Sequence, residues 1–214
     1  MAERASVPDG AGRAAKLDAV RDRLGQQGVS AFLVPRTDAH RGEWVAECDN
    51  RLSWLTGFSG SMGLCVVSAD RSALFVDGRY TLQARRQVDG AGYEINELNP
   101  ATVADWISGA VGAGGQVGFD PWLHTKSEIE RLERKLAGKG ISLCRVRNIV
   151  DEVRQDCPDP PRSGIFGHPP SLSGETSASK RQRMAEKVKS AGADAAELTL
   201  PDSIAWLLNI RGSD

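Results

Sequence analysis

The chain has 214 residues, of which 40% are hydrophobic and 26% are charged, and its formal net charge is −1. This length is enough to bury a sizeable core, and the composition is ordinary for a globular protein. The balanced charge argues against a general attraction to nucleic acid or to an anionic membrane surface.

The first part of the chain alternates between helical and extended patterns. Some segments carry apolar residues at helical spacing, as Val103, Trp106 and Ile107 do, and others are short continuous apolar runs. In chain order, the predicted elements are a helix over 13–24, a strand over 31–34, a hairpin with strands 63–68 and 73–76, a helix over 80–88, a strand over 93–98, a helix over 101–111, a strand over 116–119, a helix over 126–136 and a strand over 141–146. Strands covered by helices in this way predict an α/β sandwich with a mixed sheet.

The composition changes toward the end of the chain. Residues 156–174 are rich in proline, glycine and serine, which predicts a linker or an irregular connection. A helix over 178–190, a turn at Gly192, a strand over 195–200 and a short helix opened by Pro201 are predicted next. The first of these helices carries basic residues that are interpreted as a solvated face and not as a nucleic-acid patch: Lys180, Arg181, Arg183, Lys187 and Lys189.

Two stretches of the chain repeat one pattern. Residues 54–61 and 206–213 both read W-L-x-x-(apolar)-x-G-S, and each follows a predicted helix, a glycine turn and a predicted strand. This agreement favours a duplication, in which the second copy begins a related α/β domain and ends one residue after the motif. The expected organisation is a complete domain over 13–155, a connection over 156–174 and an incomplete second domain over 175–214.

Candidate catalytic groups are sparse. Asp38, His40 and Glu43 offer two carboxylates and an imidazole, but they share one polar loop, and nothing else in the chain obviously completes a metal-ligand set. A structural or capping role is therefore favoured for them, and Asp120 is expected to begin a turn. The glycine-flanked Ser59 does not fit the G-x-S-x-G nucleophile elbow, and glycine-rich phosphate loops are absent. We expect no catalytic residue and no metal site in this chain.

The four cysteines, Cys48, Cys65, Cys144 and Cys157, lie far apart in the sequence and form no C-x-x-C pair. This spacing argues against a compact zinc site and against a disulfide scaffold. No apolar run approaches the roughly 20 residues of a membrane span, and residues 1–15 lack the apolar core of a secretory signal. A cytoplasmic location is therefore expected.

Arg79 is the side chain that stands out. It lies in Asp77-Gly78-Arg79-Tyr80, directly after a predicted buried strand and at the start of a predicted helix. Ligand-contacting residues are commonly placed at the ends of strands in α/β sheets, and a guanidinium can pair with a carboxylate through two hydrogen bonds. Arg79 either contacts a ligand or pairs with Asp77 or another nearby acid, and the residue pattern leaves both open.

Several motifs follow one another in a specific order. Residues 38–44 read D-A-H-R-G-E-W, residues 77–80 read D-G-R-Y, residues 117–121 read V-G-F-D-P, and residues 202–214 read D-S-I-A-W-L-L-N-I-R-G-S-D. In this order they resemble motifs of the three-domain aminopeptidase P family, and the resemblance covers nearly all of residues 15–214. The first motif departs from the family's D-A-H-x-S-E-Y by having glycine in place of serine and tryptophan in place of tyrosine.

The resemblance implies that the chain is the non-catalytic N-terminal region of an Xaa-Pro aminopeptidase, a hydrolase that releases the residue preceding proline. Such enzymes have two related N-terminal α/β domains, of the creatinase/prolidase N-terminal type, that serve substrate access and dimerisation. A third domain, missing from this chain, holds two divalent metal ions, usually manganese. The implied partners are peptides with proline at the second position and a second copy of the protein, with no nucleic acid and no membrane. By motif match, Arg79 approaches the bound peptide.

Two other hypotheses stay open. The chain is either a free-standing interaction or dimerisation module without peptidase chemistry, or a creatinase- or prolidase-like relative with another substrate. A ligand series D…D…H…E…E after residue 214 would establish a peptidase, whereas a natural stop codon there would favour the module. Under the leading hypothesis, this chain alone is expected to be inactive because the metal-binding domain is missing.

Overall fold

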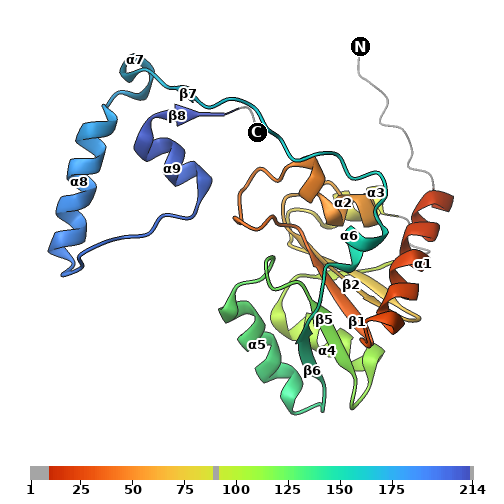
Figure 1. The fold of residues 1–214 in the computed structure, drawn as a ribbon. Coiled ribbons are helices and arrows are strands. Elements are labelled where there is room, and N and C mark those ends of the chain that lie inside the picture. The colour runs from red at the N-terminus through yellow and green to blue at the C-terminus, as the bar shows by residue number, and fades with distance from the viewer. Residues whose placement is uncertain (1–9, 89–91, 213–214) are drawn as a thin grey trace. The chain divides into compact units, whose positions relative to one another are not determined.

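The computed structural model describes residues 10–88 and 92–212 and shows two compact units (Figure 1). Unit 1 consists of residues 1–36 and 48–158, and unit 2 consists of residues 37–47 and 159–214. The last residue of the second W-L motif, Ser213, lies outside the described range. No helix in the described part of the chain is both long enough and apolar enough to cross a membrane.

Unit 1 is built on a mixed sheet with the strand order β4-β3-β2-β1-β5-β6. The strands are β1 (Ala31–Pro35), β2 (Gly63–Ser68), β3 (Ser72–Val76), β4 (Glu94–Glu97), β5 (Gln116–Phe119) and β6 (Ser142–Arg145). The predicted hairpin forms as β2 and β3. β1 pairs antiparallel with β2 and parallel with β5, while β4 and β6 extend the sheet as parallel neighbours at its two edges. The mixed α/β fold predicted from the sequence is confirmed.

Helices cover both faces of this sheet (Figure 1). They are α1 (Gly10–Gln26), α2 (Arg51–Thr56), α3 (Thr81–Gln87), α4 (Pro100–Val111), α5 (Lys126–Ala137) and α6 (Ile149–Val153), and a 3-10 turn, η1 (Glu47–Asp49), precedes α2. Successive side chains of a strand point to opposite faces. β1 therefore places Phe32 and Val34 in the core formed with α1, α2, α3 and α6, and Ala31 and Leu33 in the core formed with α4 and α5.

Unit 2 carries less regular structure. Its elements are β7 (Phe166–Gly167), α7 (Pro170–Ser173), α8 (Ser177–Ser190), α9 (Pro201–Leu208) and β8 (Ile210–Arg211). β7 and β8 form an antiparallel pair. β7 and α7 lie inside the proline-rich segment 156–174, where the sequence indicated a linker or an irregular connection.

The predicted strand over residues 195–200 is wrong. A strand exists through hydrogen bonds to a neighbouring strand, and among the described residues of unit 2 the only such pairing joins β7 and β8. Leu198 and Leu200 remain 41% and 37% exposed. The apolar alternation that predicted this strand is present in the sequence, but no described strand lies beside it.

The interpretation of the basic residues of α8 as a solvated face is wrong for Lys180. Its side chain is buried, and Nζ donates hydrogen bonds to the carbonyl oxygen of Trp206 at 3.0 Å and to Asn209 Oδ1 at 2.7 Å. Nζ also lies 4.7 Å from the centre of a Trp206 ring. A buried ammonium needs such acceptors, so Lys180 joins α8 to α9 instead of facing solvent.

Unit 1 contains the same contact. Lys16 Nζ donates to the carbonyl oxygen of Trp54 at 3.2 Å and lies 4.6 Å from the centre of a Trp54 ring. Trp54 and Trp206 are the first residues of the two W-L motifs, and the helix that carries each of them ends at a residue in the left-handed conformation, Gly57 or Asn209.

The spacing of these contacts also repeats. Lys16 precedes Gly28 by 12 residues, and Lys180 precedes Gly192 by 12 residues. Both glycines have positive φ, +68° and +71°, as expected where a helix gives way to a turn. The repeated lysine–tryptophan contact supports a common origin for these helix pairs, in addition to the matching sequence motifs.

Candidate functional site

Arg79 lies in the turn between β3, which is buried along its whole length, and α3. Its guanidinium pairs with Asp77, with Nη2 donating to Oδ2 at 2.6 Å and Nε to the two carboxylate oxygens at 3.1 and 3.2 Å. The backbone N–H of Arg79 donates to Asp77 Oδ1 at 2.9 Å. The pairing with Asp77 that the sequence left open is present, and the Arg79 side chain is 66% exposed.

A glycine-containing turn before β2 packs against the start of α3. Ser61 Oγ and Tyr80 Oη are hydrogen-bonded at 2.9 Å, and the rings of Phe58 and Tyr80 meet edge to face at 5.7 Å. Gly60 has no room for a side chain, because a Cβ there would lie 2.2 Å from the Phe58 ring. These contacts hold the Tyr80 ring, and Arg79 Cζ lies 5.2 Å from its centre.

The positive charge of Arg79 is balanced within this turn by the negative charge of Asp77. The hydrogen bonds from Arg79 hold the pKa of the Asp77 carboxyl below its ordinary value, so Asp77 is ionised at neutral pH and balances the guanidinium. The hydrogen bond with Ser61 lowers the pKa of Tyr80. A guanidinium carries five N–H donors in a planar fork. The exposed, charge-balanced Arg79 is therefore suited to hydrogen-bonding a neutral oxygen such as a peptide carbonyl.

Among the other residues considered as candidates, Asp38 holds its own loop and Ser59 contacts α3. Asp38 Oδ1 accepts hydrogen bonds from the backbone N–H of His40 at 2.9 Å and of Gly42 at 3.0 Å. Ser59 Oγ accepts a hydrogen bond from the Gln87 amide at 2.8 Å. Within residues 10–88 and 92–212, no group of three or more His, Cys, Asp or Glu side chains is placed to hold a metal ion.

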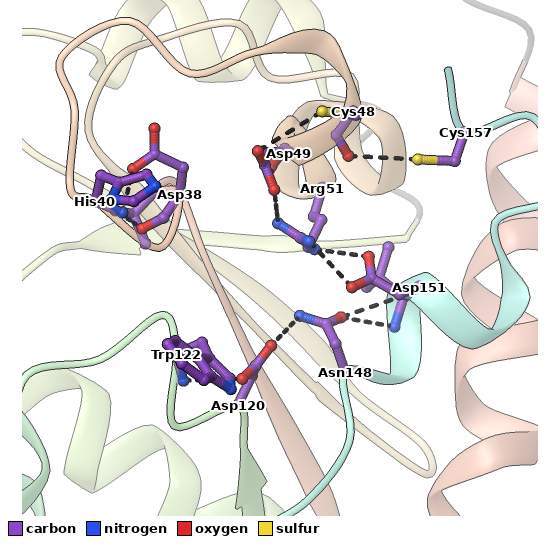
Figure 2. A network of polar contacts seen from close by, with 12 residues as sticks. Asp38, His40, Cys48, Asp49, Arg51, Asp120, Trp122, Asn148, Asp151 and Cys157 are labelled. Carbon is purple, nitrogen blue, oxygen red and sulfur yellow. Dashed lines mark hydrogen bonds and ion pairs between the residues drawn. The ribbon is translucent and has the colours of Figure 1, made fainter. Parts of the chain in front are cut away.

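A polar network joins three parts of unit 1 (Figure 2). Asn148 Nδ2 donates to Asp120 Oδ2 at 3.0 Å, at the end of β5, and Asn148 Oδ1 caps α6. In the first turn of α6, Asp151 accepts two hydrogen bonds from Arg51, at 2.7 and 3.0 Å. Arg51 also binds Asp49 at 2.8 Å, and its side chain is only 12% exposed. The network fixes the N-termini of α2 and α6 relative to the end of β5.

Sequence reasoning missed most of this network. Asp120 begins a turn as expected, since its Oδ1 accepts the backbone N–H of Trp122 at 2.9 Å. Asn148 carries a readable signal, because an asparagine just before apolar residues and an acidic first turn is typical of a helix start. The pairing of Arg51 with Asp151 spans 100 residues of sequence, and no local pattern indicates it.

Family comparisons cover nearly the whole chain. A model described as the creatinase/prolidase N-terminal domain matches residues 16–155, and a second model with the same description matches residues 156–214. Among curated proteins, aminopeptidase P2 of Arabidopsis thaliana is 37% identical over 93% of this chain and 29% of its own length. Xaa-Pro aminopeptidase 2 of Sus scrofa is 34% identical over 94% of this chain and 30% of its own length.

Among solved structures, the chain is also similar to peptidases and to their N-terminal domains. The X-prolyl aminopeptidase from Caenorhabditis elegans, described as a cytosolic enzyme with a di-nuclear active site, is 32% identical with a TM-score of 0.82, over 94% of this chain and 35% of that chain. The N-terminal domain of the cytoplasmic peptidase PepQ from Mycobacterium tuberculosis is 27% identical with a TM-score of 0.52, over 65% of this chain and 98% of that domain. The present chain spans about a third of the length of the full-length relatives it matches.

Proposed function

Because the chain belongs to the creatinase/prolidase N-terminal domain family, we propose that it is the N-terminal region of an Xaa-Pro aminopeptidase. The observation that carries the proposal is the extent of the match to the Caenorhabditis elegans X-prolyl aminopeptidase, which covers 94% of this chain. The aminopeptidases of Arabidopsis thaliana and Sus scrofa also match over 93% and 94% of this chain. A likeness that includes both units favours the aminopeptidase over a prolidase-like relative.

The activity would belong to the longer protein. It would release the N-terminal residue from peptides whose second residue is proline, with two divalent metal ions, manganese in our proposal. The di-nuclear active site of the Caenorhabditis elegans relative supports two ions. Residues 10–88 and 92–212 do not offer a ligand group for them. The role of this region would be substrate access and dimerisation, in a cytoplasmic homodimer.

Arg79 is the proposed substrate contact of this region. Its guanidinium is exposed, balanced in charge by Asp77 and held beside the Tyr80 ring. Such a group adds binding energy by donating hydrogen bonds to a polar group of the peptide, away from the bond that breaks. Asp77 and Tyr80 would act through Arg79 by limiting the directions in which its side chain points.

The proposal is tested on the full-length protein that carries this chain, produced from its own gene and loaded with manganese. We expect release of the first residue from an X-Pro peptide and much slower release from the matched X-Ala peptide. Residues 1–214 alone, treated in the same way, should release nothing. Sedimentation of the full-length protein should show a dimer.

Each contrary outcome points to a specific alternative. A full-length protein that dimerises without cleaving either peptide would favour an interaction module. Cleavage restricted to X-Pro dipeptides would favour a prolidase-like enzyme. Manganese-dependent release of the first residue by residues 1–214 alone would contradict the assignment of the metal site to another part of the protein.

A further inference from the structure

Two cysteines of unit 1 lie next to each other, although 109 positions separate them in the sequence (Figure 2). The thiol of Cys157 donates to the carbonyl oxygen of Cys48, with Sγ and O at 3.5 Å. Cys48 is buried and Cys157 is exposed. Because a carbonyl oxygen is about 2.4 Å from its own Cα, Cys157 Sγ lies within about 6 Å of the Cys48 Cα.

The segment that carries Cys157 is anchored at this place by two other contacts. Arg154 Nη1 donates to the same carbonyl oxygen of Cys48 at 3.1 Å, and the Arg154 side chain is 3% exposed. Trp54 Nε1 donates to Asp156 Oδ1 at 2.8 Å. The two cysteines are thus kept together by contacts that do not involve their thiols.

The Cys48 thiol is directed away from Cys157. Its Sγ lies 3.6 Å from Asp49 Oδ2, whereas Cys157 Sγ points at the backbone of Cys48 (Figure 2). A cysteine side chain turns between three staggered positions about its Cα–Cβ bond. Closing a disulfide, whose S–S bond is about 2.0 Å long, requires such a turn of the Cys48 side chain toward Cys157 Sγ.

We propose that Cys48 and Cys157 are a modification site that reacts with low-molecular-weight disulfides and closes into an intramolecular disulfide. Both residues lie at the ends of the second segment of unit 1, since the chain re-enters the unit at Cys48 and leaves it after Pro158. The bond would tie the segment that enters unit 1 to the segment that leaves it. This inference concerns unit 1 alone and does not depend on the peptidase proposal.

The reaction consists of two thiol–disulfide exchanges. The exposed Cys157 attacks a sulfur of the small disulfide as a thiolate, its S–S bond breaks, and one small thiol leaves with the proton that Cys157 lost. Cys48, as a thiolate, then attacks the Cys157 sulfur of the mixed disulfide and releases the second small thiol. In total, two protein thiols are oxidised to one disulfide, and one small disulfide is reduced to two thiols.

The order of the two steps follows from the surroundings of each thiol. Cys157 is exposed, so a small disulfide can reach it. Cys48 is 8% exposed, and burial together with the nearby Asp49 raises the pKa of its thiol. A buried thiol that is less easily ionised is a poor first nucleophile. It can still complete the exchange, because its target is the adjacent Cys157 sulfur.

The test incubates folded, reduced residues 1–214 with glutathione disulfide and follows the intact mass. We expect a loss of two hydrogen atoms without a retained glutathione. After blocking of the remaining thiols and digestion with trypsin, peptides 42–51 and 155–162 should be joined. Cys65 and Cys144 fall in separate tryptic peptides, so a disulfide that involves either of them would give a different linked peptide. The oxidised chain should also melt at a higher temperature than the reduced chain.

Three variants decide the outcome. Cys48→Ser should trap one glutathione on Cys157, Cys157→Ser should give neither the trapped adduct nor the linked peptide, and the control Cys144→Ser should behave as the unaltered chain does. A stable glutathione adduct on Cys157 of the unaltered chain, with no linked peptide, would overturn the proposal. So would a linked peptide that contains Cys65 or Cys144. Circular dichroism of each reduced variant confirms that it is folded before oxidation.

Discussion

The direction of the Arg79 side chain is restricted by residues that lie near it in space. Arg79 is held by Asp77 two positions away and by the ring of Tyr80, which in turn is held by Ser61 from another segment. The guanidinium stays exposed while its direction is restricted. This combination suits a group whose loss would affect binding more than folding.

Arg79→Ala in the full-length protein should lower kcat/KM for an X-Pro peptide. Losing one hydrogen bond to a charged group costs about 1.5–3 kcal/mol, which corresponds to roughly a 10- to 150-fold change. Stability should hardly change, because exposed ion pairs contribute little to the free energy of unfolding. The measurements are peptide kinetics and thermal melting, with Arg85→Ala on the exposed side of α3 as the control. Early melting with normal turnover of the folded fraction would make Arg79 structural.

Glu94 predicts a pH-dependent contribution to stability. Hydrogen bonds from Arg71 at 2.9 and 3.0 Å, with a further one from Trp106, hold the pKa of Glu94 below its ordinary value. A lowered folded-state pKa gives stability that is present above the ordinary pKa and lost as the pH falls through the lowered one. Glu94→Gln should therefore destabilise the chain at neutral pH, by no more than about 1 kcal/mol at this half-exposed site.

Urea unfolding of the Glu94→Gln variant and of the unaltered chain, between neutral pH and about pH 3, measures this contribution. The difference in unfolding free energy should shrink toward the acidic end. Glu97→Gln, on the same strand, is the control and should show a smaller difference at neutral pH. A difference for Glu94→Gln that is equally large across the whole pH range would argue against the ion pair as its source.

At the scale of helices and strands, the sequence patterns predicted correctly those elements that form through contacts between residues close in the sequence. The hairpin of β2 and β3 and the amphipathic helix α4 follow from apolar spacing and were found as predicted. The short helix α6 was not predicted, because five residues carry too little periodicity and its cap, Asn148, gains its second partner from a distant segment. The strand over 195–200 failed for the opposite reason: its pattern is present, but no described strand pairs with it.

Polar side chains also divide into those whose position could be predicted from local sequence and those whose position could not. The position of Arg79 after a buried strand could be predicted from sequence, since the D-G turn and the strand before it are local features. The buried polar contact of Lys180 with Asn209 could not, because a basic stretch on a helix normally indicates solvent exposure. Long-range pairing of polar side chains has no periodicity from which it could be read.

Asn148→Ala should destabilise unit 1 more than a loss of helix capping alone. Asn99 and Asn148 each cap a helix by accepting two backbone N–H groups, but only Asn148 also donates to a carboxylate, that of Asp120. Removing a cap costs about 0.5–2 kcal/mol, and removing a hydrogen bond to a charged group costs about 1.5–3 kcal/mol. Asn99→Ala is therefore the matched control in urea unfolding. Equal losses for the two variants would mean that the bond to Asp120 adds nothing.

At the scale of the whole molecule, the two units differ in how much apolar surface they bury. The buried hydrophobic residues of the described chain all belong to unit 1. Unit 2 leaves several large apolar side chains exposed: Trp44, Ile165, Phe166, Leu172, Leu198, Leu200, Trp206 and Leu208. Its two described strands, β7 and β8, have two residues each. Buried apolar area is the main source of folding free energy, so the two units should differ in local stability.

Amide hydrogen exchange on the isolated chain should be faster in unit 2 than in unit 1. Amides of α8 and α9 open more readily because few buried contacts hold these helices, whereas α4 lies against a buried core. Exchange followed by mass spectrometry compares these helices in one sample. Equal protection of α8 and α4 would contradict the expected difference. Lys180→Ala should speed the exchange of α8 further, and the exposed Arg181→Ala should not.

The position of β1 in the sheet also affects the order in which the protein can be completed during synthesis. One edge of β1 pairs with β2, which ends at Ser68, and the other pairs with β5, where Val117 lies opposite Ala31. A ribosome adds about 5–20 residues per second, so β5 is made roughly 2–10 s after β2. Through that interval an apolar strand edge is open to pairing with other chains. A chaperone that binds this open edge would therefore matter most while only the N-terminal half of unit 1 has been made.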